Sequence, residues 1–345
     1  MLKIAKERLN ELYAKINETM GLFIPVKHAG EVNYEVWHEG KEVSLETLKT
    51  VKSPKNAFFP QSENLMKFKT EGKNIEVIDV RECWDERKPF VMFGVKACDY
   101  KAIEVLDKVF LADPVDTYYQ NRRELTTIVT LACSKPDESC FCKAFGIDAT
   151  APQGDVTTWL DNEYLYWQAN TEKGEALTAL VKEFFVEGGE AEVAMQQEAT
   201  KVIMEKLPFS NLDLSKFTPE NLNELFNAKE WNEMSEACLG CGTCTFVCPT
   251  CQCFDIRDIK TNEGVLRYRC WDSCMYSDFT LMAHGNSRTT QMQRFRQRFM
   301  HKLVYYPSQN DGLYSCVGCG RCVNKCPQRL NIVKVIKTLG GKDND

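Results

Sequence analysis

Residues 1–170 alternate between runs rich in Val, Ile and aromatic residues and segments with helical spacing. The runs predict buried or half-buried strands, because β-branched and aromatic side chains pack well on a pleated sheet. They cover residues 32–37, 75–80, 90–95, 126–132 and 157–167. Between the third and fourth runs, Ile103, Leu106 and Phe110 fit one face of a helix. This strand–helix–strand order predicts a βαβ unit with parallel strands.

Helical patterns occur at the amino terminus and again after residue 170. Apolar residues recur near helical spacing in residues 1–20. Residues 174–185 and 190–207 combine good helix formers with few helix breakers. These three segments are therefore predicted to be helical.

The pattern changes near residue 210. Residues 208–217 predict a linker, and Thr218 before Pro219 predicts an N-cap and a first-turn proline. A helix is expected to follow over residues 220–236. We therefore expect an α+β protein with a mixed α/β domain over residues 1–207, a linker over residues 208–217 and a second domain over residues 218–345.

The composition of the chain excludes some classes of function. The chain has 345 residues, a net charge of −6 and 17 cysteines. An acidic chain gives no electrostatic reason to bind nucleic acid. The amino terminus lacks the apolar stretch of a secretory signal, and no apolar run approaches the ~20 residues that span a bilayer. We expect a cytoplasmic protein without a membrane span, whose reduced thiols are metal ligands and not disulfides.

Two nearly identical strings carry eight of the cysteines: "CLGCGTCTFVCP" over residues 238–249 and "CVGCGRCVNKCP" over residues 316–327. Each reads C-x2-C-x2-C-x3-C-P. Gly242 and Gly320 remove side-chain bulk where the backbone must approach a cluster, and they permit a positive φ. Structural zinc sites use CxxC pairs and do not explain two complete copies.

The same spacing predicts two [4Fe–4S] clusters. Each cluster is held by four thiolates, and in two-cluster ferredoxins the fourth cysteine of each string ligates the other cluster. On that pattern one cluster is held by Cys238, Cys241, Cys244 and Cys326, and the other by Cys316, Cys319, Cys322 and Cys248.

A long insertion separates the two strings, and much of it is predicted to be helical. This favours an α-helical dicluster ferredoxin domain over the compact β-hairpin type. The insertion contains four more cysteines, Cys251, Cys253, Cys270 and Cys274. They could form a further cluster, but we favour packing near the clusters as small apolar side chains. The basic segment 284–302 is either a solvated helix face or a source of positive charge for a partner or a cluster.

The amino-terminal half holds a second group of cysteines. Cys98 follows the strand at residues 90–95, and Cys133 follows the strand at residues 126–132. Parallel strands end at one edge of a sheet, where ligands of α/β proteins collect. The loop after Cys133 adds Cys140 and Cys142. We predict a third [4Fe–4S] cluster held by these four residues, with a zinc site and unligated buried thiols as alternatives. Cys83 has no assigned role.

The order of these motifs resembles a known family. "GVKACD", "CSKPDESCFC", the two cysteine strings and "RYRCWDSC" resemble the iron–sulfur subunit of anaerobic sulfite reductase and the β subunit of sulfhydrogenases. The likeness covers nearly the whole chain. It implies an electron-transfer subunit between a reductase subunit that binds flavin and NAD(P)H and a catalytic subunit of the sirohaem sulfite reductase or NiFe hydrogenase type. Related modules serve bifurcating assemblies of the heterodisulfide reductase type.

The binding motifs that the sequence contains and those that it lacks together predict the function. It shows neither a GxGxxG string that opens a helix after a strand nor a GxxxxGK[ST] string, so no flavin or nicotinamide site is evident. No acid–base pair is evident either, and no catalytic residue is assigned. We expect an electron relay that is not catalytic alone. The alternatives are an enzyme whose amino-terminal cluster has an open iron, and a redox sensor.

Overall fold

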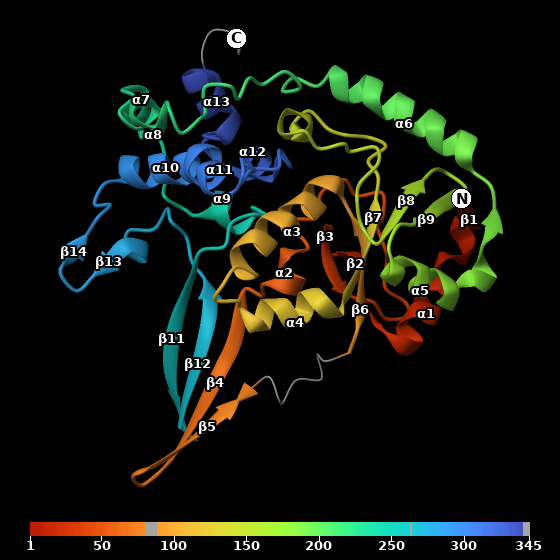
Figure 1. Cartoon of the computed structure of the whole chain (residues 1–345), viewed down its shortest axis with the longest axis horizontal. Coiled ribbons are helices and arrows are strands. Elements are labelled where there is room, and N and C mark those ends of the chain that lie inside the picture. The colour runs from red at the N-terminus through yellow and green to blue at the C-terminus, as the bar shows by residue number, and fades with distance from the viewer. Residues whose placement is uncertain (81–87, 263, 341–345) are drawn as a thin grey trace.

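The computed structural model describes residues 1–80, 88–262 and 264–340 (Figure 1). Cys83 lies outside the described residues. The main sheet has eight strands in the order β10-β1-β9-β8-β7-β6-β2-β3. Their bounds are β1 Leu2–Ala5, β2 Gly21–His28, β3 Glu31–Val36, β6 Phe90–Val95, β7 Thr126–Leu131, β8 Val156–Leu160, β9 Tyr164–Ala169 and β10 Val186–Glu187.

Helices cover both faces of this sheet, as the mixed α/β prediction requires. Strands β2, β6, β7 and β8 are parallel, and α3 (Ala97–Phe110) and α4 (Thr117–Leu125) cross from β6 to β7. They pack with α2 (Lys55–Phe58) in one apolar core, whereas α1 (Leu9–Thr19) and α5 (Glu172–Leu180) pack in another. The predicted strands and the βαβ unit are confirmed.

The amino terminus differs from the expected single helix. Residues Leu2–Ala5 form β1, which lies between β9 and β10 in antiparallel register, and α1 begins only at Leu9 after the short turn η1 (Lys6–Arg8). Backbone hydrogen bonds from two neighbouring strands outweigh the weak helical pattern of these residues. Strand β2 was not predicted.

A second sheet projects from the body as an arm (Figure 1). It has the antiparallel order β11-β12-β4-β5, with bounds β4 Ser62–Glu71, β5 Asn74–Asp79, β11 Phe254–Thr261 and β12 Gly264–Trp271. The prediction of a helical insertion is therefore wrong for its first half, where β11 and β12 form a hairpin. The sheet joins segments from both sides of the predicted linker, and the division into domains stays a prediction.

A buried ion network attaches the arm to the body. The Glu63 carboxylate on β4 accepts hydrogen bonds from Arg122 of α4 and from Arg269 of β12, the Nε of Arg269 lying 3.1 Å away. Arg269 also pairs with Asp116, whose side chain caps α4. All but Asp116 are buried. This pairing holds three charges away from water, which is tolerable only because each has an opposite partner.

Four of the remaining helices bury side chains in a separate apolar core around Trp231, Phe295 and Phe299: α7 Leu222–Phe226, α8 Glu230–Ser235, α10 Gln291–Met300 and α13 Ile332–Gly340. The short helices α9 Thr243–Phe246 and α12 Arg321–Lys325 pack against this core, whereas α6 Glu190–Glu205 and α11 Tyr306–Gln309 contribute no residue to it. A π-helical turn, η7 (His301–Tyr305), continues α10 into α11, and β13 (Leu281–Met282) pairs with β14 (Gly285–Asn286). No helix in the described part of the chain is long and apolar enough to cross a membrane.

The helix expected over residues 220–236 is broken into α7 and α8. Leu225 and Trp231 are both buried in the same core, although a spacing of six residues places side chains about 120° apart around a continuous helix. The break lets both face inward, and the Trp231 indole N–H donates to the Leu225 carbonyl at 2.6 Å. The predicted cap at Thr218 is also wrong, because α7 begins after Asn221.

Candidate metal centres

The two cysteine strings lie side by side across two small cavities. Cys238, Cys241 and Cys244 line the first cavity together with Cys326 of the other string. Cys316, Cys319 and Cys322 line the second together with Cys248. The structure thus brings together the two sets of four that the crossed pattern predicts. Within the described ranges, no group of three or more His, Cys, Asp or Glu side chains is drawn together tightly enough to hold a metal ion.

Most of these thiols are buried, and burial sets their protonation. Burial raises the pKa of Cys244 to about 11 and the pKa of Cys319 to about 12. Cys241 is exposed, and its hydrogen bond with the Thr243 hydroxyl lowers its pKa. Thiolates at the buried positions are unfavourable without a nearby cation, and bound iron would provide that charge.

Two buried cations supply further positive charge beside the sulfurs. Arg298 lines both cavities, and Lys302 lines the second. The Lys302 ammonium donates to the Thr250 hydroxyl at 2.8 Å and the Ser315 carbonyl at 2.9 Å. Burial alone lowers the pKa of Arg298, yet the Cys244 and Cys322 sulfurs raise it well above its usual value. An anionic, thiolate-ligated cluster fits these cavities, because buried charges need partners of opposite sign.

The cationic side chains of the basic segment 284–302 thus point in two directions. Arg298 and Lys302 point inward to the cysteine strings. Arg296 instead stacks over the Phe226 ring at 3.5 Å and donates to the Phe226 carbonyl. The helix α10 that carries Arg296 and Arg298 begins with a capping box of Thr290 and Gln293, which fixes where its inward face starts.

The amino-terminal cysteines also lie together. Cys98 is in the first turn of α3, and Cys133 follows β7 at the carboxyl edge of the parallel strands. Cys133 and Cys142 belong to one buried apolar cluster, against which Cys98 packs. Cys140 is close enough to Cys133 and Cys142 to raise the pKa of both, after the larger effect of burial. All four predicted residues are therefore brought together.

Lys96 is an unusual neighbour of these thiols. It is 8% exposed and has no hydrogen bond or ion pair among the residues with described positions. The neighbouring groups that could carry a negative charge are the sulfurs of Cys133 and Cys98 and the Asp99 carboxyl group. Lys96 borders a pocket, yet an ammonium with so little exposure and no direct partner is costly. An anionic group on the neighbouring sulfurs would offset that cost, so the donor set fits a cluster here as well.

The second cysteine string packs directly on the loop of the amino-terminal group. Gly318 and Gly320 have positive φ values of 59° and 73°. A Cβ atom would lie 2.4 Å from the Phe141 backbone at Gly318 and 2.3 Å from the Ser139 carbonyl oxygen at Gly320. The Phe141 N–H donates to the Gly318 carbonyl at 2.9 Å. Only glycine permits both this conformation and this close approach.

A buried ion pair reinforces the same contact. Arg321 of α12 donates to both carboxylate oxygens of Asp99 in α3, at 2.6 and 2.8 Å, and its Nε donates to the Thr50 carbonyl at 3.0 Å. The two residues are next in sequence to Cys322 and Cys98. Cys319 consequently lies close enough to Cys98 and Cys142 to affect the pKa of each.

The extra cysteines of the insertion do not assemble as one group of four. Cys251 hydrogen bonds with Cys248, and Cys253 with Cys274. Cys270 lies apart on β12, opposite Asp255 of β11. The hydrogen bond from Cys274 lowers the pKa of Cys253 to about 7. The structure thus places Cys251, Cys253 and Cys274 together beside Cys248 of the first string and separates Cys270 from them.

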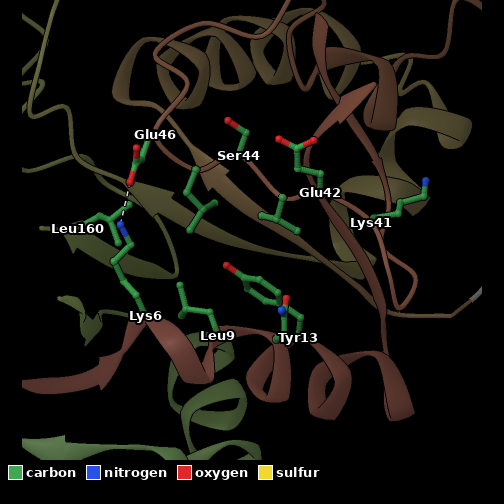
Figure 2. A pocket seen from close by; sticks show the side chains of 11 residues that line it. Lys6, Leu9, Tyr13, Lys41, Glu42, Ser44, Glu46 and Leu160 are labelled. Carbon is green, nitrogen blue, oxygen red and sulfur yellow. Dashed lines mark hydrogen bonds and ion pairs between the residues drawn. The ribbon is translucent and has the colours of Figure 1, made fainter. Parts of the chain in front are cut away.

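Two adjoining pockets at the carboxyl edge of the main sheet had no signal in the sequence. The larger, about 470 Å³, is lined by Lys6, Tyr13 and Glu46 among others (Figure 2). The smaller, about 240 Å³, shares Glu46 with it and reaches Lys96 and Cys133. The dashed line in Figure 2 marks the pair of Lys6 and Glu46, 2.7 Å apart. The lining residues are far apart in the chain, so no local motif could reveal them.

Comparisons with known proteins agree with this arrangement. Residues 237–330 match a family model described as a 4Fe-4S dicluster domain, so this part of the chain is similar to [4Fe–4S] dicluster domains. Over 342 residues the chain is 33% identical to sulfhydrogenase 2 subunit beta of Pyrococcus furiosus, and the match covers 97% of each chain. The chain therefore belongs to the sulfhydrogenase beta subunit family, which confirms the resemblance. No solved structure gives a significant match.

Proposed function

We propose that this protein is an iron–sulfur electron-transfer subunit of a multisubunit oxidoreductase. The observation that carries the proposal is the crossed arrangement of the two strings, since each cavity is lined by three cysteines of one string and the last cysteine of the other. The four residues of each set would hold one [4Fe–4S] cluster, a group that accepts and releases one electron at a time.

A third cluster is proposed at Cys98, Cys133, Cys140 and Cys142. Its support is the convergence of the four thiols and the unpaired charge of Lys96 beside them. The zinc alternative stays open, because four cysteine thiolates also suit a structural zinc ion.

The chain sets the three groups of thiols in a row. Cys319 of the second string lies beside Cys98 and Cys142 of the amino-terminal group. Cys244 of the first string lies beside Cys322 and Cys248. At one end of the row Cys133 reaches a pocket, and at the other Cys241 is exposed. Because both ends of the row are accessible from outside, the row suits a relay of electrons between two partners.

The partners are proposed from the family. Sulfhydrogenase 2 subunit beta is by its name one subunit of a larger enzyme. We infer a flavin- and NAD(P)H-binding reductase subunit on one side and a catalytic subunit of the hydrogenase or sulfite reductase type on the other. A second function, an enzyme with an open iron in the amino-terminal cluster, is favoured by one observation: the pocket of about 240 Å³ that reaches Cys133.

One set of measurements on anaerobically purified, reconstituted protein tests the proposal. Three clusters predict about 12 iron atoms and as many sulfides per chain, and two predict about 8. Cys133→Ser should lose about a third of the iron and keep the carboxy-terminal pair. Cys270→Ser is the matched control, because Cys270 lies apart from all three groups, and its iron content should equal that of wild type.

The outcomes separate the hypotheses. One equivalent of zinc with about 8 iron atoms would rule out the third cluster and leave the relay in place. Absence of the broad visible absorbance of iron–sulfur clusters after reconstitution would overturn the relay itself. The reconstituted chain should be reduced by dithionite but show no turnover with hydrogen, sulfite or polysulfide. Turnover by the isolated chain would favour the open-iron enzyme.

A further inference from the structure

The Arg298 side chain occupies a position that it shares between both cysteine strings. It lines the cavity of Cys238, Cys241, Cys244 and Cys326 and also the cavity of Cys316, Cys319, Cys322 and Cys248. It is 2% exposed, so water does not solvate its charge. Helix α10 brings it there from outside both ligand loops.

The hydrogen bonding of this guanidinium is incomplete. Its Nη2 donates to the Cys244 carbonyl at 3.1 Å. Its Nε and Nη1 are buried and have no hydrogen-bond partner in the described part of the chain. No carboxylate there pairs with it either, and the neighbouring groups that could carry a negative charge are the sulfurs of Cys244, Cys322, Cys251 and Cys248. A guanidinium stays charged and carries five N–H donors, so buried donors of this kind need acceptors.

The cations next to Arg298 differ from it, because each has oxygen acceptors for its hydrogen bonds. Lys302 has two oxygen acceptors within 2.9 Å, and Lys55 donates to the Cys248 and Cys251 carbonyls at 3.0 and 2.9 Å. The Arg298 guanidinium lies 4.5 Å from the centroid of the Phe299 ring, which accounts for part of its packing but accepts no hydrogen bond in the plane of the guanidinium. The two nitrogens Nε and Nη1 of Arg298, which carry three N–H donors, are therefore the ones that lack an acceptor.

We propose that Arg298 is a positioning residue shared by the two carboxy-terminal clusters, whose free N–H groups donate to sulfur at both sites. The inference rests on the proposed function, because it requires both clusters. Hydrogen bonds to sulfur and nearby positive charge stabilise the reduced, more negative state of a cluster, and so raise its reduction potential. One side chain thereby sets two potentials together.

Redox titration followed by electron paramagnetic resonance tests this on the full, reconstituted chain. In Arg298→Met both carboxy-terminal clusters should shift to more negative potentials, while iron content stays that of wild type. Arg298→Lys keeps the charge but loses the planar fork, so its shifts should be smaller. Arg296→Met is the matched control on the same helix, because Arg296 lies over Phe226 and away from the cysteines, and it should leave both potentials unchanged.

The results distinguish this inference from the proposed function. Full iron content in Arg298→Met with unchanged potentials would overturn the role of Arg298 and leave the relay intact. A shift confined to one cluster would overturn the sharing. If Arg298→Met loses iron, the role of Arg298 is tested by comparing Arg298→Lys with wild type. Equal reduction potentials in those two proteins would contradict hydrogen-bond donation by the guanidinium. Wild-type protein that forms no clusters would refute the proposed function instead.

Discussion

Single residues decide how closely the second cysteine string approaches the amino-terminal loop. Gly318 and Gly320 have no side chain to separate the two backbones, and the resulting contact places Cys319 beside Cys98 and Cys142. Arg321 acts in the same region by pairing with Asp99. At this scale the sequence predicted the ligand cysteines and the role of Gly320, but not which other residues would face them.

Gly318→Ala tests that contact. Its Cβ would lie 2.4 Å from the Phe141 backbone at a φ of 59°, so one of the two loops must move. We expect a loss of at least about 2 kcal/mol in the free energy of unfolding, together with a lower iron content. Anaerobic urea unfolding followed by circular dichroism measures the first.

Gly312→Ala is the control for Gly318→Ala. Gly312 also has a positive φ, 79°, but nothing lies within 4 Å of its Cβ position. It should lose only the conformational term of about 1 kcal/mol and keep its iron. Equal losses in the two variants would show that the loop contact is not responsible.

Secondary-structure elements fix which surfaces can carry the sites. Helix α10 with its π-helical extension brings Arg298 and Lys302 inward, and the break between α7 and α8 buries both Leu225 and Trp231. The four-stranded arm depends on elements from two distant segments, β4 with β5 and β11 with β12. Its attachment to the body is the buried Glu63 network.

Glu63→Gln tests the attachment of the arm. The change removes the carboxylate that Arg122 and Arg269 share in a buried environment. Breaking a buried pair on one side costs about 3–5 kcal/mol, and we expect a destabilisation of that size in urea unfolding. Asp258→Asn in the same sheet should be nearly neutral, because its pair with Arg267 is exposed. A comparable effect of both changes would contradict the role of burial.

The whole molecule is organised around the contact between the main sheet and the cysteine strings. The carboxyl edge of β6 and β7 presents Cys98 and Cys133, and α12 presents the second string to the same place. The ion pair of Arg321 and Asp99 joins these parts across the predicted domain boundary. Both side chains are nearly inaccessible to solvent.

Arg321→Met should weaken this junction. It leaves the Asp99 carboxylate buried without its partner, at a cost of about 3–5 kcal/mol. The double variant Arg321→Met, Asp99→Leu removes both charges and should recover much of that stability. Lys325→Met on the exposed side of α12 is the control and should be nearly neutral. No recovery in the double variant would show that the arginine acts through something other than Asp99.

The sequence alone determined the local features of this protein. Runs of β-branched and aromatic residues predicted β3, β5, β6, β7, β8 and β9, and the spacing of Ile103, Leu106 and Phe110 predicted α3. The C-x2-C-x2-C-x3-C-P strings identified two sets of cysteines, because ligand spacing within a loop is set by neighbours in the chain. Because parallel strands end at one edge of a sheet, the sequence also predicted that Cys98 and Cys133 lie close together.

Only the tertiary structure decided which distant groups meet. The hairpin of β11 and β12 was not predicted, and β12 pairs with β4, which comes from the other side of the predicted linker. The placement of Arg298 between the two cavities, of Lys96 beside Cys133 and of Cys319 beside Cys142 depends on packing between elements. Such contacts join residues at no fixed separation along the chain, so neither periodicity nor motif spacing predicts them.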